Sequence, residues 1–241
     1  MSSPTMMPMS LEEIAQAVQG RLIAGTAAID TPVATSTFTD SRQIVEGSVF
    51  VAIAGERVDG HDYVSKVGAQ GAVAAIVDHE IDGAGVPQIV VEDTVLALGA
   101  LAKHNIERRR ALETPFTVIG ITGSVGKTTT KDLMKALLAH IGPTIAPVGS
   151  FNNEIGLPLT SLKVHAETRF LIAEMGANHV GEIANLTSLV PPDIAVVLKV
   201  GVAHLGEFGS PERIAQAKSE IIRGLVPVSY THLTLPTNPY V

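Results

Sequence analysis

The residues with the clearest chemical potential form a glycine-rich turn that ends in a Lys-Thr pair, directly after an apolar run. Run and turn read FTVIGITGSVGKTTT over residues 116–130. Backbone N–H groups of such a turn, and of the helix that follows it, bind phosphate oxygens. Lys127 then supplies a cation for the β- and γ-phosphates, and the Thr128 hydroxyl can coordinate Mg²⁺. The pattern predicts a polyphosphate-binding loop made of Gly123, Ser124, Val125, Gly126, Lys127, Thr128 and Thr129.

The spacing of this loop departs from the general pattern G-x-x-x-x-G-K-[ST]. Five residues separate Gly120 from the pair Gly126-Lys127, and two separate Gly123 from it. An ordinary Gly-rich turn is therefore the alternative interpretation. The strand expected before the turn and the helix expected after it favour phosphate binding.

Four further stretches place polar residues where parallel strands are expected to end, the edge at which α/β sheets bind ligands. Asn152 and Asn153 lie in FNNEIGLP, Glu174 closes a strand, His204 follows another strand, and Lys218 lies in a helix. A carboxylate at position 174 can hold Mg²⁺ opposite the phosphate loop. Each residue also has a purely structural interpretation: turn-forming asparagines, a helix-capping glutamate, a structural histidine and an exposed helix lysine.

The composition limits the partners of the chain. It has 241 residues, 46% of them hydrophobic, and a formal net charge of −7. A chain of this length can form two globular domains. The acidic balance, with no basic cluster beyond residues 108–110, argues against nucleic acid and anionic membranes as partners. Small molecules are the expected ligands.

Cellular location follows from what the sequence lacks. The N-terminal stretch MSSPTMMPMS has neither a positive n-region nor an apolar h-region, and no apolar run reaches membrane-spanning length. The absence of cysteine excludes disulfides and thiolate metal sites. We expect a cytoplasmic protein, and a monomer.

Two α/β domains are expected to position these residues, the first over residues 1–110. Ser10 is predicted to cap a helix that Gly20 ends. Pro115 disfavours helix at Thr114, so 111–115 is a predicted linker. The expected strands of the first domain are 49–54, 72–77 and 88–91, and its expected helices are 11–19, 63–70 and 94–110.

The second predicted domain, residues 116–225, alternates strands with helices in the rhythm of a parallel sheet. Its fold class is that of a P-loop-type parallel-sheet domain. The expected strands are 116–121, 169–174 and 193–200, and the expected helices are 128–140 with apolar Leu133, Met134, Leu137 and Leu138, then 158–164, 180–190 and one that begins near Ser210.

The end of the chain has a different composition. Residues 224–241 contain no Asp, Glu, Lys or Arg but hold Tyr230 and Tyr240. We hypothesise that 226–241 is a non-native tail that replaces the natural continuation of a longer protein. Sequencing the native locus tests this, because a reading frame that stops at Val241 contradicts it.

Five local patterns occur in order along the chain: TDSR at 39–42, FVAIAGERVDGHDYV at 50–64, TGSVGKTTTK at 122–131, NNEIGLP at 152–158 and EMGANHVGEI at 174–183. Together they resemble the Mur ligase family, the ATP-dependent amide-forming enzymes of peptidoglycan precursor synthesis. The resemblance runs from about Ser10 to Leu225. Family members are longer and carry a third, C-terminal domain, so the resemblance implies that the second domain is incomplete here.

The resemblance implies a ligand for each domain: the first binds the UDP part of a substrate, and the second binds ATP. Arg42 would make charge-assisted hydrogen bonds to the diphosphate, and a surface pair with Asp40 is the alternative. Asn152 and Asn153 join the phosphate loop as ATP contacts. The implied contacts of the UDP precursor are Thr39, Asp40, Ser41, Arg42, Gly55, Asp59, His61 and Asn178.

The resemblance further implies two Mg²⁺ ions. Thr128, Glu174, His204 and Lys218 would be their ligands, and Lys127 would join the last three as catalytic residues. Glu174 would hold the ion that bridges the ATP phosphates, and His204 a second ion. Lys218 corresponds to the lysine that the family carbamylates, a modification that turns a cation into a carboxylate able to coordinate metal.

The expected reaction joins D-alanyl-D-alanine to UDP-MurNAc-tripeptide through an acyl phosphate. NNEIGLP and GANHVGEI favour this member of the family, and a sibling ligase that adds another amino acid stays open. A second alternative is a non-catalytic module that binds only the UDP precursor and the nucleotide. A generic P-loop ATPase or kinase would leave residues 1–110 without a role.

Overall fold

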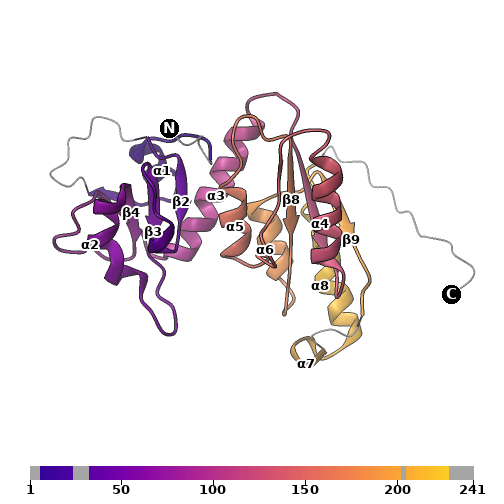
Figure 1. Cartoon of the computed structure of the whole chain (residues 1–241). Coiled ribbons are helices and arrows are strands. Elements are labelled where there is room, and N and C mark those ends of the chain that lie inside the picture. The colour runs from indigo at the N-terminus through magenta and orange to yellow at the C-terminus, as the bar shows by residue number, and fades with distance from the viewer. Residues whose placement is uncertain (1–5, 24–32, 202–204, 228–241) are drawn as a thin grey trace, which may run out of the picture.

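A computed structural model of the chain describes residues 6–23, 33–201 and 205–227. Two α/β lobes lie side by side, and the long helix α3 (Thr94–Arg110) runs between them (Figure 1). The predicted α/β class is confirmed, with one sheet in each lobe. Among the residues described, no helix is both long and apolar enough to cross a membrane.

The first sheet has five strands in the order β1-β5-β4-β3-β2, with only β1 antiparallel to its neighbour. The strands predicted at 49–54, 72–77 and 88–91 are present, whereas two strands were missed because three residues are too few to establish a period. Because β2, β3 and β4 are parallel, the loops after them lie at one edge of the sheet. The bounds are β1 (Arg21–Ile23), β2 (Ser36–Phe38), β3 (Ser48–Val51), β4 (Ala72–Val77) and β5 (Gln88–Val90).

The first helix, α1 (Leu11–Ala17), is capped as predicted, since the Glu13 N–H donates to Ser10 Oγ over 3.1 Å. The Glu13 carboxylate does not return to Ser10; it pairs instead with His104 and Arg108 of α3. The helix expected at 63–70 is a short α-helix flanked by 3₁₀ turns. These elements are η1 (Ser41–Gln43), η2 (Gly60–Tyr63), α2 (Val64–Val67) and η3 (Gly68–Gln70).

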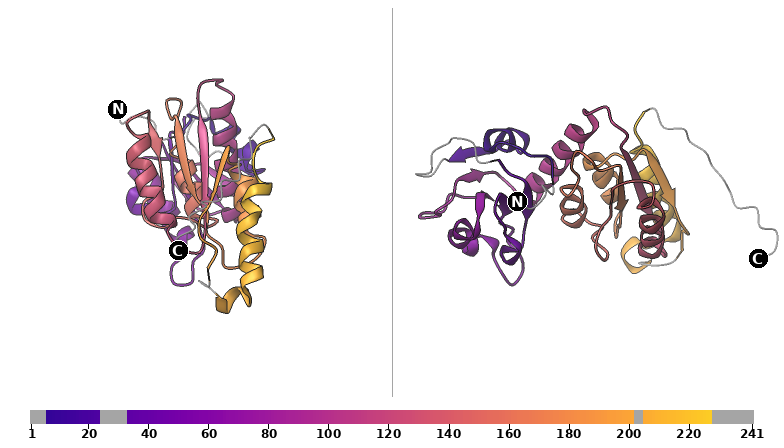
Figure 2. Two further views of the ribbon diagram at one scale, coloured as in Figure 1. Left: turned by 90° about the vertical axis from the view of Figure 1, so that its right-hand side faces the viewer. Right: turned by 45° about the horizontal axis from the view of Figure 1, so that its top comes forward.

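The second sheet is parallel throughout, in the order β7-β8-β6-β9. Helices α4 and α8 cover opposite faces of it (Figure 2). Ile119 and Ile121 of β6 pack beneath α4, while Val118 lies in the core shared with α6 and α8. The elements are β6 (Thr117–Thr122), α4 (Lys127–Leu138), β7 (Thr144–Ile145), α5 (Gly156–Ser161), β8 (Phe170–Glu174), α6 (Glu182–Leu189), β9 (Ile194–Val197), α7 (Leu205–Phe208) and α8 (Pro211–Arg223).

The four apolar residues noted in the sequence of α4 do not all enter the core. Met134 and Leu138 pack against the sheet, but Leu133 and Leu137 are 62% and 69% exposed. Residues one position apart on a helix point about 100° away from each other, so a helix on one face of a sheet can bury only one of the two pairs.

Helix α3 belongs to both lobes through two buried polar side chains. Asn105 accepts from the Met7 N–H and donates to the carbonyls of Ser161 and Val164, each over 3.0 Å. Arg109 is 2% exposed and donates to the carbonyls of Thr168 and Pro115. These bonds satisfy backbone carbonyls that water cannot reach, and they fix α3 to the second lobe.

Candidate functional site

The predicted phosphate loop has the expected strand, turn and helix around it. Helix α4 begins at Lys127, one residue before the predicted start, with Gly126 as its N-cap at φ +87°. Gly123 has φ +150°, and a Cβ there would lie 2.8 Å from Leu198 Cβ. Both positions therefore require glycine. The Lys127 side chain folds back over the turn, and its Nζ donates to the Gly123 carbonyl over 2.8 Å.

The same loop is held by the segment that follows β9. The Ser124 N–H donates to the Lys199 carbonyl, and Ser124 Oγ accepts from the Gly201 N–H, each over 3.0 Å. Ser124 is buried, whereas Val125 and Thr129 are exposed. The neighbouring strand thus fixes the backbone of the turn before a ligand is present.

Glu174, at the carboxyl end of β8, is the buried acid of the site, with 1% of its surface exposed. Its carboxylate accepts from Thr128 Oγ1 over 3.2 Å and from Asn152 Nδ2 over 3.0 Å. Both donors are neutral, and no Lys, Arg or His of the described segments lies within ion-pair distance of it. A buried carboxylate without a cation is unfavourable, so a divalent metal ion fits this position.

Lys218 is buried, which excludes the exposed-lysine interpretation. It is 2% exposed, its Nζ donates to the Ala177 carbonyl over 3.2 Å, and it lies 5.4 Å from the centre of the Phe208 ring. Burial, and then the charge of Lys127, lower the pKa of Lys218 from 10.5 to about 8. An amine is no metal ligand while it is protonated. The fourth predicted metal ligand, His204, lies outside the described residues.

The shifted pKa makes folding stability depend on pH. Between pH 8 and 10.5 the folded chain has lost the Lys218 proton while the unfolded chain retains it. Stability therefore rises with pH across this window, by up to roughly 3 kcal/mol from this residue. Urea denaturation of wild type and Lys218→Met at both ends of the window measures the difference. Lys163→Met, at an exposed lysine, should show the same dependence of unfolding free energy on pH as wild type. If Lys218→Met also shows the wild-type dependence, the assignment is contradicted.

A cavity of ≈ 610 Å³ lies beside the phosphate loop. It brings together four predicted residues, Lys127, Asn152, Asn153 and Asn178. It is also lined by Glu154, Glu182 and Asn185, which the sequence did not single out although two of them lie inside the motifs NNEIGLP and EMGANHVGEI. The Glu182 carboxylate accepts from the Asn178 N–H over 2.7 Å. The cavity is thus polar and acidic apart from Lys127.

The candidate residues of the first domain lie at the carboxyl edge of its sheet. Thr39 to Arg42 follow β2, and Gly55 to His61 follow β3. Arg42 pairs with Asp40 through two hydrogen bonds of 2.9 and 2.7 Å, which lower the pKa of Asp40 to about 2. The pair with Asp40 is the alternative interpretation of Arg42. The Arg42 side chain is 87% exposed, so it can leave Asp40 for another partner. A contact between Arg42 and a diphosphate stays a prediction.

Two family profiles match the chain. The profile described as "Mur ligase family, catalytic domain" matches residues 35–106, and "Mur ligase middle domain" matches residues 121–236. Between them they match strands β2 to β5 of the first sheet, the phosphate loop, and strands β7, β8 and β9 of the second sheet.

Ligases and solved ligase structures align with most of the chain. The UDP-N-acetylmuramoyl-tripeptide--D-alanyl-D-alanine ligase of Mycobacterium tuberculosis is 43% identical over 90% of the chain and 46% of its own length. A crystal structure of MurF from Acinetobacter baumannii aligns with TM-score 0.81 and 39% identity, over 94% of this chain and 48% of that one. MurF from Thermotoga maritima in complex with ADP aligns with TM-score 0.69 and 38% identity, over 80% and 44%. The chain spans about half the length of these relatives.

Proposed function

Because this chain belongs to the Mur ligase family, we propose that it forms the precursor-binding and ATP-binding parts of a ligase that joins D-alanyl-D-alanine to UDP-MurNAc-tripeptide. The observation that carries the proposal is the buried Glu174 carboxylate, which accepts a hydrogen bond from Thr128 at the phosphate loop and pairs with no cation of the described residues. The names of relatives about 40% identical support the choice of substrates over those of a sibling ligase. The protein would act in peptidoglycan synthesis in the cytoplasm, as a monomer, and so contribute to cell shape and division.

ATP would bind along residues 123–129, with its phosphates on the backbone N–H groups at the start of α4. Lys127 would leave the Gly123 carbonyl and bind the transferring phosphoryl group. Thr128 and Glu174 would hold one Mg²⁺, and His204 with a carbamylated Lys218 a second. These ions would neutralise negative charge on the phosphates. The lowered pKa of Lys218 supports carbamylation, because the neutral amine is the form that reacts with carbon dioxide.

The reaction proposed has two steps. A carboxylate oxygen of the tripeptide attacks the γ-phosphorus of ATP, and the bond from that phosphorus to ADP breaks. The amine of D-alanyl-D-alanine then attacks the acyl carbon, loses a proton, and phosphate leaves. The contribution of the chain is positioning and charge stabilisation, so we propose no covalent enzyme intermediate.

Calorimetric titration of UDP-MurNAc-tripeptide tests the precursor site, with the dipeptide precursor and UDP as comparators. We expect the tripeptide to bind most tightly, and Arg42→Ala to weaken binding by about 10-fold or more through loss of charge-assisted bonds. Arg223→Ala, at an exposed arginine of α8, is the matched control. Failure of a folded chain to bind any of the three ligands would overturn the assignment of the first domain.

A second candidate is a non-catalytic module that binds the precursor and a nucleotide. ADP release that requires both the tripeptide and D-alanyl-D-alanine would exclude it.

A further inference from the structure

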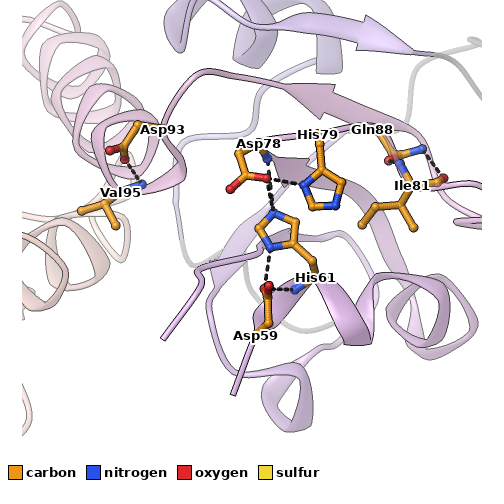
Figure 3. A network of polar contacts seen from close by, with 8 residues as sticks. All are labelled: Asp59, His61, Asp78, His79, Ile81, Gln88, Asp93 and Val95. Carbon is orange, nitrogen blue, oxygen red and sulfur yellow. Dashed lines mark hydrogen bonds and ion pairs between the residues drawn. The ribbon is translucent and has the colours of Figure 1, made fainter. Parts of the chain in front are cut away.

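A cluster of two histidines and two aspartates lies at the carboxyl edge of the first sheet (Figure 3). Asp59 and His61 come from the loop after β3, and Asp78 and His79 directly follow β4. The side chain of His61 is 5% exposed, whereas those of Asp78 and His79 are 40% and 63% exposed. The cluster therefore has one buried imidazole and an opening to solvent.

Asp59 fixes the orientation and the tautomer of His61. Its Oδ1 accepts from the His61 backbone N–H over 2.9 Å and from ring Nδ1 over 2.6 Å. Gly60 allows this tight turn, since a Cβ there would lie 2.7 Å from Ile53 N. With its proton on Nδ1, His61 presents the lone pair of Nε2 to the rest of the cluster.

The lone pair of His61 Nε2 faces both a carboxylate oxygen and the backbone N–H of Asp78. His61 Nε2 lies 3.2 Å from Asp78 Oδ1, and the Asp78 N–H donates to the same Nε2 over 3.2 Å. His79 Nδ1 also contacts Asp78 Oδ1, and the two imidazole rings stack with their centres 4.8 Å apart. Two ring nitrogens thus converge on one carboxylate oxygen.

The side chains of His61, Asp78 and His79 offer one metal ion two imidazole nitrogens and one carboxylate oxygen, all within 4.8 Å of one another. A single metal ion would bind both rings and the carboxylate, and at His61 Nε2 it would replace the hydrogen bond from the Asp78 N–H. Zn²⁺ bonds to nitrogen and oxygen ligands are about 2.0–2.2 Å long, which puts neighbouring ligand atoms roughly 3.3 Å apart. The distance from His61 Nε2 to Asp78 Oδ1 matches that spacing, and rotation of the exposed His79 ring adjusts the third ligand.

We propose that His61, Asp78 and His79 form a binding site for a divalent transition-metal ion of the Zn²⁺ type, with Asp59 as the residue that positions His61. Imidazole nitrogens select Zn²⁺, Co²⁺ or Ni²⁺ over Mg²⁺. The site therefore differs in chemistry from the oxygen-lined Mg²⁺ position at Glu174, and it lies in the other domain.

Calorimetric titration of the untagged chain with Zn²⁺, in excess Mg²⁺ to occupy oxygen-only sites, tests the proposal. We expect Asp78→Asn and His79→Ala each to remove one equivalent of bound Zn²⁺. Both side chains are largely exposed, so these variants should fold like wild type. Asp59→Asn does not touch the metal and should weaken binding by roughly 10- to 100-fold, the usual effect of removing the partner of a ligand histidine.

Matched controls separate this site from general surface binding. Asp82→Asn lies on the same loop, and His140→Ala removes an exposed histidine of the second domain; neither should change Zn²⁺ affinity or stoichiometry. Imidazole ¹⁵N spectra should show Zn²⁺ shifting His61 Nε2. Wild-type stoichiometry in Asp78→Asn and His79→Ala, or no saturable binding by wild type, would overturn the proposal.

Discussion

Lys127→Ala is expected to weaken binding of Mg²⁺-ATP by roughly 10- to 100-fold, because a charged hydrogen bond contributes about 1.5–3 kcal/mol. Lys127 is the only basic residue among the described residues that line the cavity beside the loop, where Glu154 and Glu182 carry the opposite charge. Titration of nucleotide into wild type and variant measures the loss.

Lys135→Ala is the control for this experiment, since Lys135 is exposed two turns further along α4. It should bind Mg²⁺-ATP like wild type. UDP-MurNAc-tripeptide should bind the Lys127→Ala chain with unchanged affinity, because its expected site lies in the other domain. In a complete enzyme the chemical step should fall far more than precursor binding, and equal losses in both would count against the assignment.

Arg109→Ala is expected to destabilise the chain by about 3 kcal/mol or more, since it leaves buried carbonyls without donors and removes a packed side chain. Arg109 donates to the carbonyls of Thr168, Thr114 and Pro115, and its guanidinium lies 4.9 Å from the centre of the Phe116 ring. No carboxylate of the described chain pairs with it, and burial lowers its pKa. For a chain of this size the melting temperature should fall by roughly 6 to 12 °C.

Two variants make this measurement specific. Lys103→Ala changes an exposed residue of the same helix and should alter the melting temperature little. Arg109→Lys keeps the charge but loses the planar fork of donors, so its melting temperature should lie between those of wild type and Arg109→Ala. If Arg109→Ala melts like Lys103→Ala, Arg109 does not hold α3 against the second lobe.

Local sequence patterns predicted the elements whose conformation depends on near neighbours. β4 and α3 have the predicted bounds, and Ser10 caps α1 as expected. The conformation of the predicted phosphate loop could also be read from the sequence, because glycines at fixed offsets permit its positive φ angles. Short strands such as β2 and β7 carry too few residues for a period.

Contacts between distant residues were decided only by the tertiary structure. The sequence could not tell whether Lys218 is exposed or buried, because burial depends on what packs against the side chain. It also gave no sign that Asn105 and Arg109 join the lobes, or that His79 meets His61 across two loops.

A local pattern was thus enough to predict an α/β fold with a strand, a glycine-rich turn and a helix of the kind that binds phosphate, since that turn is a local structure. The fold decided which polar residues meet. Parallel strands bring the residues that follow them to one edge, so Glu174 reaches Thr128 from β8, and Asp78 reaches His61 from β4. Such encounters depend on strand order, which no short motif encodes.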